Sequence, residues 1–362
     1  MVFTFGIEEE FLLMDASTGF PTAAQELTRA LISPDQGTFT SSAELLDAQV
    51  ESSTRVCTTR EEALDALLGF RSRLAGAAAA TGVRVAATGA APRIAEGPPV
   101  LNSSDRYRRM GVLTGAVAHE QYVNGTHIHV GIPSRDTGVR VLNGLRPWLA
   151  LLGAVAANSP YWRGQDSSFA SWRMVHYRRW SVQGCPPVFA DAQDYARRLE
   201  GLLATDVVLD AGHVGWAARL SENFPTVEVR IADAQLQAGD SLLLAALVRS
   251  LVQTLASDGA AVPAVVPDPE LLDVGLWQAA RFGMGGNLLS HPGGSVPAAE
   301  HLDALLEYVA PALEDAGDSD FVTAGLARVL GTGTGAERQR AAVRSGGYPG
   351  LADLYTRSLT AE

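Results

Sequence analysis

The stretch Gly6-Ile7-Glu8-Glu9-Glu10-Phe11-Leu12-Leu13 sets three adjacent glutamates between apolar residues. Side chains on a β-strand alternate between its two faces, so a strand here puts Glu8 and Glu10 on one face and Glu9 on the other. Two carboxylates held side by side repel each other unless a divalent cation neutralises them, and Mg²⁺ binds oxygen ligands of this kind. The stretch predicts either a metal-binding strand or a solvated edge strand guarded by charges.

Residues 41–54 contain a second pair of carboxylates, Glu44 and Glu51, seven positions apart. On a helix this spacing puts both on one face, and on strands joined by a kink they could also converge. An exposed helix face is the simpler interpretation of such a pair taken alone. The secondary structure of this segment stays open at this point.

Residues 124–131 contain the pair His127 and His129 on a predicted strand, with both imidazoles on one face. Neutral imidazole is a common ligand of transition metals, so the metal could be zinc as well as magnesium. Two hydrogen-bonded histidines in the core are the alternative.

In residues 225–233 the alternation places Glu228 and Arg230 on one face and three β-branched residues on the other. The pair could be an ordinary salt bridge within the strand. It could also give Glu228 to a metal and Arg230 to a phosphate or carboxylate, because the guanidinium fork matches both. Carboxylates and imidazoles at alternate strand positions thus recur in several segments.

The pattern of apolar residues predicts an α+β domain with a cupped, mostly antiparallel sheet, because several strands carry polar groups at alternate positions. Residues after about 267 should form a C-terminal helical layer on the same single domain. The best candidates for linkers are the Pro-containing stretches 89–101 and 259–270, and neither is long enough to separate two domains. The predicted strands are residues 4–14, 84–87, 123–132, 215–221 and 226–233. The predicted helices are residues 60–81, 147–157, 191–204, 240–256 and 298–309.

Composition and net charge exclude several classes of partner and of chemistry. The chain has 362 residues and a net charge of −12, which repels nucleic acid and anionic membranes. All 28 positive side chains are arginine, so Schiff-base and Walker-type lysine chemistry are excluded. Two cysteines without a pairing pattern, no signal peptide and no apolar run long enough to span a bilayer favour a cytoplasmic protein.

Taken together and in this order, the motifs resemble the glutamate-cysteine ligase family, in particular its type 2 branch of bacterial, YbdK-like carboxylate-amine ligases. The motifs that carry this resemblance are G-I-E-E-E-F at 6–11, E-L-L-x-x-Q-V-E at 44–51 with Thr54, Arg106-Tyr107, G-x-H-x-H-V-G at 125–131, T-V-E-V-R-I-A-D at 226–233, and the segment 277–283.

The resemblance implies a glutamine-synthetase-like fold in which two or three Mg²⁺ ions, or Mn²⁺, bridge ATP to the site. It implies that Arg230 holds the transferring phosphate and that Arg230 and Glu228 are catalytic, and it leaves His129 as a candidate for contact with the nucleotide or substrate. The implied metal ligands are Glu8, Glu10, Glu44, Glu51, His127 and Glu228. Candidates for binding the substrate carboxylates are Arg106, Tyr107, Arg173, Arg178 and Arg179.

The implied reaction phosphorylates a carboxylate with ATP and lets an amine displace the phosphate. Metal ions suit this chemistry because they neutralise the charge on the phosphoryl oxygens. Glutamate is the expected acyl donor, and cysteine, another amine or a peptide the acceptor, with a homodimer as a further suggestion. The alternatives are a metal-dependent hydrolase that uses His127 and His129, and a non-catalytic protein that binds a nucleotide or metabolite.

Overall fold

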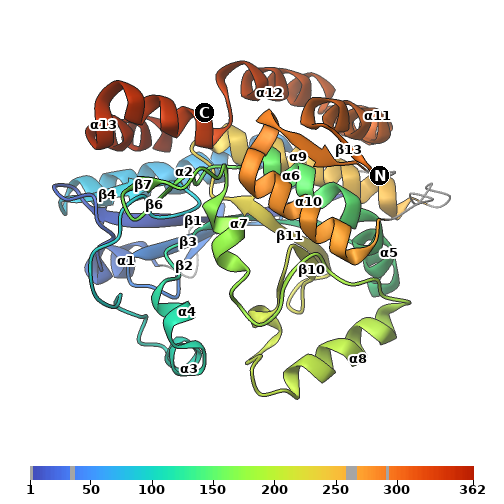
Figure 1. The fold of residues 1–362 in the computed structure, drawn as a ribbon, viewed down its shortest axis with the longest axis horizontal. Coiled ribbons are helices and arrows are strands. Elements are labelled where there is room, and N and C mark those ends of the chain that lie inside the picture. The colour runs from blue at the N-terminus through green and yellow to red at the C-terminus, as the bar shows by residue number, and fades with distance from the viewer. Residues whose placement is uncertain (1–2, 33–36, 258–266, 291–292) are drawn as a thin grey trace.

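The computed structural model describes residues 3–32, 37–257, 267–290 and 293–362. Its centre is a seven-stranded sheet in the order β10, β11, β5, β1, β3, β2, with β4 paired to β1, and all of these pairs are antiparallel (Figure 1). The strands are β1 (Phe5–Asp15), β2 (Phe39–Ala43), β3 (Gln49–Thr54), β4 (Val83–Ala86), β5 (Gly125–Gly131), β10 (Ala218–Leu220) and β11 (Thr226–Asp233). Three short pairs lie outside this sheet: β6 (Tyr161–Trp162) with β7 (Gln165–Asp166), β8 (Gln183–Gly184) with β9 (Gly215–Trp216), and β12 (Asn287–Leu289) with β13 (Ser295–Pro297).

Helices cover one face of the sheet (Figure 1), and a cavity lies on the other face. The helix α2 contacts β3 and β4, α9 contacts β1 and β5, and α6 contacts β11. The helices up to α9 are α1 (Gln25–Leu31), α2 (Arg60–Ala79), α3 (Asp105–Thr114), α4 (Ala116–His119), α5 (Arg135–Leu145), α6 (Leu149–Val155), α7 (Trp172–Tyr177), α8 (Ala192–Leu203) and α9 (Ala238–Ala256).

The chain after residue 267 is mainly helical. Its helices are α10 (Pro269–Phe282), α11 (Ala298–Ala316), α12 (Ser319–Thr332) and α13 (Gly335–Leu359). The helices α11 and α12 pack on α9, α10 packs on α6, and α13 contacts α2 and β4. The predicted loop 259–270 lies largely outside the described residues.

The alternation predicted for β1 is confirmed. Glu9 is buried on the helical side, where its carboxylate accepts hydrogen bonds from Arg71 on α2 and from Ser241 on α9. Glu8 and Glu10 face the other way, into the cavity. One strand therefore separates an internal ion pair from a group of facing carboxylates.

The helix α9 is long and apolar enough to span a membrane by length and composition, yet 89% of its most apolar window is buried inside the protein. Leucine, alanine and valine on all of its sides pack into the main hydrophobic cluster, between the sheet and the helices α11 and α12. This burial is typical of a core helix, which is apolar all round because it has neighbours on every side.

Most predicted elements form, with changes at proline and glycine. The strands β1, β4, β5 and β11 lie within two residues of prediction, whereas residues 215–221 divide into β9 and β10. Pro147 makes the start of the predicted helix 147–157 a 3₁₀ turn, Arg146–Trp148, before α6. The helix α11 continues beyond Val309 through Pro311 to Ala316.

Candidate active site

A cavity of about 390 Å³ opens on the face of the sheet that carries Glu8 and Glu10, and we call it the acidic cavity. Its volume is in the range of small-molecule sites. Strands β1, β3, β5, β10 and β11 contribute its floor, and α3 and α7 contribute to its walls. The ionisable side chains that line it are Glu8, Glu10, Glu44, Glu51, Arg106, Tyr107, His127, His129, Arg173, Tyr177, His213, Arg219, Glu228 and Arg230.

The register of the sheet brings the predicted metal ligands together. Residues directly opposite each other on antiparallel strands have Cβ atoms about 5 Å apart, so their side chains meet on the same face. The opposed pairs are Glu10 with Glu51, Glu8 with His127, and His129 with Glu228. Together these pairs form one row across β3, β1, β5 and β11.

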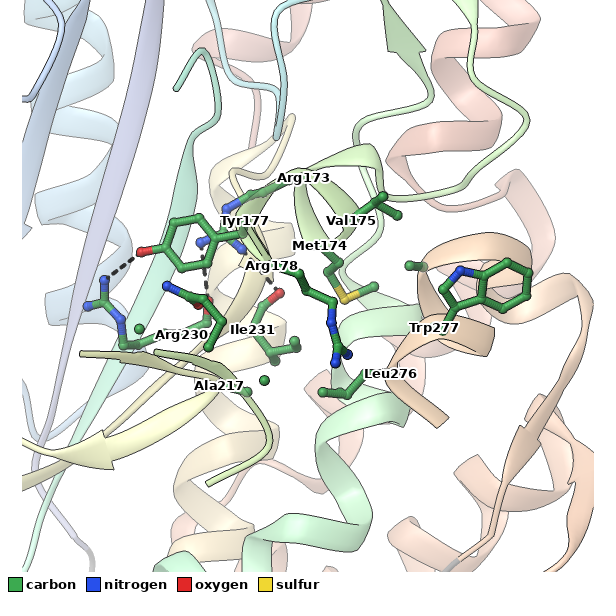
Figure 2. A pocket seen from close by; sticks show the side chains of 14 residues that line it. Arg173, Met174, Val175, Tyr177, Arg178, Ala217, Arg230, Ile231, Leu276 and Trp277 are labelled. Carbon is green, nitrogen blue, oxygen red and sulfur yellow. Dashed lines mark hydrogen bonds between the residues drawn. The ribbon is translucent and has the colours of Figure 1, made fainter. Parts of the chain in front are cut away.

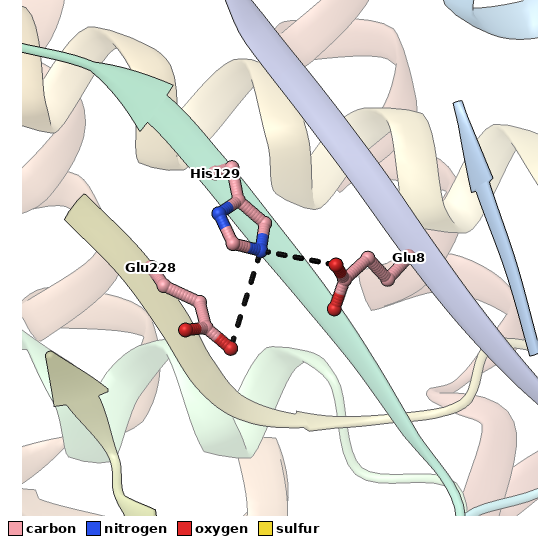
Figure 3. Close-up of side chains that lie close together, drawn as sticks. All are labelled: Glu8, His129 and Glu228. Atoms are coloured by element: carbon pink, nitrogen blue, oxygen red, sulfur yellow. Dashed lines mark ion pairs between the residues drawn. The ribbon is translucent and has the colours of Figure 1, made fainter. Parts of the chain in front are cut away.

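Three overlapping groups in this row have the composition of cation sites. Within each group the candidate ligand atoms lie within 4.8 Å of one another. The groups are Glu8, His129 and Glu228 (Figure 3); Glu8, Glu51 and His127; and Glu10, Glu44 and Glu51. Each carboxylate can bridge two cations, so the row can hold more than one ion.

Residues 41–54, whose secondary structure the sequence left open, belong to a β-hairpin formed by β2 and β3. Glu51 lies on β3, and Glu44 lies in the turn that follows β2, so the two converge on the cavity from a strand and a turn. Leu45 N donates to Glu44 Oε2 at 3.0 Å, and Tyr107 of α3 donates its hydroxyl to the same oxygen at 3.2 Å. The helix interpretation is therefore wrong, and the kinked-strand interpretation is confirmed.

Crowding raises the pKa of two carboxylates in the row, so these groups are harder to ionise. Burial and the nearby Glu44 carboxylate raise the pKa of Glu10 to about 8. Burial also raises the pKa of Glu51 well above its usual range, and Glu8 and Glu44 raise it further. A cation bound among these groups would remove the repulsion that raises the pKa values.

Glu8 remains ionised at neutral pH because it faces two imidazoles. Burial raises its pKa, but contacts with His127 and His129 outweigh burial and hold the pKa well below its usual range. His127 Nδ1 lies 3.1 Å from one Glu8 oxygen and His129 Nε2 lies 3.3 Å from the other. Glu8 therefore joins two of the three groups.

Glu228 is held ionised by arginines. Burial raises its pKa, but the Arg230 and Arg219 guanidinium groups lower it further than burial raises it. Arg219 Nε donates to Glu228 Oε2 at 2.7 Å, and Arg230 contacts the other oxygen. Glu228 thus keeps a negative charge although its side chain is almost fully buried.

The two histidines differ in protonation. Burial and the Arg230 charge lower the pKa of His127 to about 4, so this ring is neutral at pH 7. Burial lowers the pKa of His129 too, but Glu8 and Glu228 outweigh it and raise that pKa. A neutral imidazole is the form that binds a metal.

The donor set fits divalent cations. His127 Nε2 is buried and makes no hydrogen bond within the described residues, and its nearest carboxylate oxygen, from Glu10, is 3.8 Å away. His129 Nε2 lies between Glu8 and Glu228 without an aligned hydrogen bond. Buried polar atoms are normally satisfied, so these nitrogens indicate a missing partner. Carboxylates with at most one imidazole per group suit Mg²⁺ or Mn²⁺ better than a soft metal.

Arg230 is placed by an irregularity in β11. The pairing of β11 with β5 shifts between Val229 and Ala232, and Arg230 N donates instead to Ala217 O at 2.8 Å. Arg230 Nη2 donates to the Tyr177 hydroxyl at 3.3 Å. Bulges of this kind often redirect a side chain beside an active site. Here the bulge directs the guanidinium to the end of the carboxylate row.

Arg173 supports the same bulge from α7. Its guanidinium donates to the carbonyl oxygens of Arg230 at 3.2 Å and of Ile231 at 3.3 Å, and it is 3% exposed. A Cβ atom on Gly125 would lie 2.4 Å from Arg173 Nη2, so only glycine fits at that position. Arg173 lines the acidic cavity and also fixes the backbone beneath Arg230.

The remaining predicted substrate residues divide into two groups. Arg106 lines the acidic cavity, where its guanidinium binds Asp210 at 2.7 Å. Arg178 and Arg179 do not line this cavity: Arg178 pairs with Asp273 at 2.9 Å, and Arg179 pairs with Glu120. Successive residues on a helix point about 100° apart, so the end of α7 cannot direct all three of its arginines to one place.

Sequence analysis did not single out Arg219 and Tyr177, which contact Glu228 and Arg230 in the cavity. Arg219 on β10 lies opposite Glu228 on β11 and neutralises it. An arginine inside a predicted strand was the available signal. Tyr177 lies between the predicted substrate residues Arg173 and Arg178, and its contact with Arg230 depends on long-range packing.

The family-model comparison covers nearly the whole chain: the model described as glutamate-cysteine ligase family 2 matches residues 4–356. The chain belongs to this family. A glutamate-cysteine ligase 2-1, so named, from Nocardia farcinica is 43% identical over 340 residues, which are 93% of this chain and 88% of the relative. One from Saccharopolyspora erythraea is 42% identical over 342 residues, 94% and 90% of the two chains.

Solved structures show that the ligase has the predicted glutamine-synthetase-like α+β fold. The glutamate-cysteine ligase of Francisella tularensis, solved with AMP, superposes with a TM-score of 0.72 at 12% identity, over 100% of this chain and 90% of that one. A bifunctional glutathione synthetase from Pasteurella multocida gives a TM-score of 0.72 at 15% identity, over 99% and 52%. The ligase of the prokaryotic ubiquitin-like protein Pup gives 0.52 at 11%, over 97% and 71%.

Family and fold together make the chain an ATP-dependent carboxylate-amine ligase, as the motifs predicted. The hydrolase and the non-catalytic alternatives are not favoured. All of the sequence motifs that suggested the family, except the segment 277–283, contribute residues to the lining of the acidic cavity.

Proposed function

We propose that the ligase uses ATP and divalent cations to convert the side-chain carboxylate of glutamate into an acyl phosphate, and then joins the acyl group to an amine. The observation that carries the proposal is the row of three overlapping carboxylate and imidazole groups that ends at Arg230. Phosphoryl transfer depends mainly on positioning and on neutralising charge, and this row offers both.

The three groups would hold Mg²⁺ or Mn²⁺. Glu10, Glu44 and Glu51 would hold one ion, and Glu8 and Glu51 with His127 a second. When bound, the cations supply Lewis-acid neutralisation of the phosphoryl oxygens. Two or three ions are compatible with the shared carboxylates.

His129 lies beside Glu8 and Glu228, where it would serve as a metal ligand. This role would come in addition to contact with the nucleotide or substrate. His129 Nδ1 contacts the Thr226 hydroxyl at 3.0 Å, which fixes the ring with Nε2 directed at the two carboxylates. A histidine oriented by a hydrogen bond to its second nitrogen is the usual arrangement of a metal ligand.

In the first step an oxygen of the glutamate carboxylate forms a bond to the γ-phosphorus of ATP, and the bond from that phosphorus to ADP breaks with its electron pair on ADP. Arg230 would bind the oxygens of the transferring group, because its fork is held at the end of the row and stays charged. Arg173 and Arg106 would bind the substrate carboxylates from the cavity wall.

In the second step the amine nitrogen forms a bond to the acyl carbon, and the carbon–oxygen bond to phosphate breaks with its electron pair on phosphate. An ammonium acceptor loses one proton to water before it attacks and a second to the leaving phosphate as the amide forms, and the amide nitrogen keeps the third. The products are an amide, ADP and phosphate. Cysteine is the acceptor that the family name suggests, and another amine or a peptide is compatible with the same chemistry.

The test is ADP release by the purified ligase with ATP, Mg²⁺ and glutamate while single amines are added, beginning with cysteine. The expected result is amine-dependent ADP with a condensed product of matching mass. Glu228→Gln should abolish ADP formation while the protein stays folded by circular dichroism. Glu300→Gln, an exposed change on α11, is the matched control. Full activity of the Glu228 variant, or Mg-ATP binding that calorimetry fails to detect, would contradict the proposal.

A further inference from the structure

The carboxylate of Asp233, the last residue of β11, is enclosed by hydrogen-bond donors from two other segments of the chain. Its Oδ2 accepts from Asn158 N at 2.8 Å and from the Ser159 hydroxyl at 2.7 Å, and its Oδ1 accepts from the Ser171 hydroxyl at 2.8 Å. Asp233 is 1% exposed, and a Cβ atom on Gly89 would lie 2.4 Å from its Cγ, so close packing confines the group. Burial of a carboxylate is costly, and Asp233 does not line the acidic cavity, so its role lies in the segments that it holds.

Both serines in turn hold the start of α7. Ser171 is the N-cap residue of this helix, and its hydroxyl oxygen accepts from Met174 N at 3.2 Å. The Ser159 hydroxyl oxygen accepts from Arg173 N at 3.1 Å. An ionised carboxylate only accepts hydrogen bonds, so both hydroxyls donate toward Asp233 and keep their lone pairs for the backbone N–H groups of α7. The end of β11 therefore fixes the first turn of α7 through two serines.

The first turn of α7 carries Arg173, whose guanidinium is held by the same strand. This guanidinium donates to the carbonyl oxygens of Arg230 and Ile231 (Figure 2). The strand β11 therefore holds Arg173 twice, because Asp233 acts on its backbone through Ser159 and the bulge acts on its side chain. Arg173 is the arginine of α7 that lines the acidic cavity, whereas Asp233 and Ser159 do not line it. These two residues can therefore act on a bound substrate only through α7.

We propose that Asp233 is a positioning residue of the ligase, which sets the place of Arg173 and thereby the affinity for the substrate carboxylate. This inference rests on the proposed function, in which Arg173 binds that carboxylate, and it adds a residue that touches neither substrate nor cation. A binding group must be held within about 0.5 Å of its productive position by the contacts around it, and the two serines bound to Asp233 supply such contacts to the backbone of Arg173. If Asp233 served only the stability of the fold, its loss would lower the melting temperature without a selective effect on one substrate.

The substrate dependence of acyl-phosphate formation tests the proposal. Hydroxylamine as the acceptor converts an acyl phosphate into a hydroxamate, so the assay works without the natural amine. Asp233→Asn keeps the size of the side chain but replaces one acceptor oxygen with a donor, so at least one of the three donors loses its partner. We expect the KM for glutamate to rise about tenfold while the KM for Mg-ATP changes less than about twofold, which is the pattern of lost substrate binding. A KM for glutamate within about twofold of the wild-type value, or an equal rise in both KM values, overturns the proposal.

A second buried carboxylate controls for lost stability. Asp318 is fully buried at the N-cap of α12, where it binds Arg249, and it does not line the acidic cavity. Asp318→Asn should lower the melting temperature but keep the wild-type KM for glutamate. A rise in this KM equal to that of the Asp233 variant would attribute both effects to instability and overturn the proposal.

Ser159→Ala tests the link to Arg173 without a change at the carboxylate. It removes the hydroxyl between Asp233 and Arg173 N and leaves the carboxylate its other two donors, so it also serves where Asp233→Asn does not fold. Its KM for glutamate should rise about threefold or more, and an unchanged KM overturns the proposal. The double variant should exceed the Asp233 variant in this KM by less than about twofold, because both changes break one connection. Effects that multiply independently also overturn the proposal.

The wild type separates failure of this inference from failure of the ligase function. Hydroxamate that depends on ATP, Mg²⁺ and glutamate supports the function, whatever the variants do. Variants with an unchanged KM for glutamate then overturn only the role of Asp233. Absence of hydroxamate in the wild type overturns the function and this inference with it.

Discussion

Arg230 lies at the end of the carboxylate row, where one guanidinium contacts both Glu228 and the Tyr177 hydroxyl. Lysine keeps the charge but cannot form two directed hydrogen bonds with one planar group. We expect Arg230→Lys to lower kcat about a hundredfold, as loss of one preorganised donor does in other enzymes. Steady-state ADP formation measures this, and Arg197→Lys, exposed on α8, is the control. Near-normal turnover of the Arg230 variant would exclude a two-point phosphate contact.

His176 gives the protein a specific acid sensitivity. Burial and the Arg179 charge lower its pKa to about 4, and the ring nitrogen Nε2 lies 2.5 Å from Glu120 O. Arg163 and the Glu120 carboxylate also face this ring. Between its folded pKa and the ordinary value of 6.5, the unfolded state binds a proton that the folded state does not. The free energy of unfolding therefore rises as the pH rises through this window. The contribution of His176 to stability is lost as the pH falls through the same window.

The variant His176→Gln should remove this contribution, because an amide can still donate to the Glu120 carbonyl but does not titrate. The wild-type curve of unfolding free energy against pH should be steeper than that of the variant by up to about 1.4 kcal/mol per pH unit between pH 4 and 6.5. Urea titrations at several pH values supply both curves. Parallel curves in this window would show that His176 is not a neutral buried group.

At the scale of elements, the ion pair between Glu9 and Arg71 joins β1 to α2 and to the end of the chain. Arg71 donates to both Glu9 oxygens, at 2.9 and 2.6 Å, and also to the carbonyls of Gln235, Leu236 and Leu359. Both partners are almost fully buried. Removal of one partner leaves an uncompensated charge in the core.

We expect Glu9→Gln to lower the free energy of unfolding by about 3–5 kcal/mol, the usual cost of breaking a buried pair. The double change Glu9→Leu with Arg71→Leu should recover part of this loss, because neither buried charge remains. Guanidinium unfolding measures each protein, with Glu61→Gln, 76% exposed in its side chain, as the control. A single Glu9 variant as stable as the control would mean that the pair contributes nothing.

The alternation of side chains along single strands made much of the site predictable. Glu8 with Glu10, His127 with His129, and Glu228 with Arg230 each share a face because the strand period is two, and no tertiary information is needed to see it. The strand order and register were not predictable from period alone. It is the register that sets Glu8 opposite His127 and so makes the separate pairs into one row.

The parts that sequence analysis missed depend on long-range geometry. From the sequence alone, the segment that brings Glu44 beside Glu51 could have been a helix, because a separation of seven residues fits one helix face as well as two converging strands. Arg173 reaches the cavity, but Arg178 and Arg179 leave α7 in other directions and find their own carboxylates. The position of His129 between Glu8 and Glu228 follows from the register of the sheet and could not be read from its own strand.

At the scale of the whole molecule, the carboxylates that the acidic cavity needs for cation binding lower the stability of the metal-free fold. Four glutamates, Glu8, Glu10, Glu44 and Glu51, lie close together in a protein of net charge −12, and no arginine forms an ion pair with any of these four within the described ranges. Like charges at this spacing destabilise the fold unless a cation binds. A ligand that binds only the folded state raises the free energy of unfolding by about 2.7 kcal/mol when its concentration is a hundredfold above its Kd.

Metal removal and replacement therefore test the site independently of turnover. After treatment with chelator, Mg²⁺ or Mn²⁺ should raise the melting temperature of the ligase and restore ADP formation, whereas Zn²⁺ alone should not restore it. Glu51 belongs to two of the three groups, so Glu51→Gln should melt at or above the temperature of the metal-free wild type while losing most of the Mg²⁺ shift. Scanning calorimetry with and without Mg²⁺ gives both values, and Glu300→Gln should keep the full shift. A Glu51 variant that keeps the full shift would remove this residue from the metal site, and activity restored by Zn²⁺ without ATP would return the hydrolase interpretation.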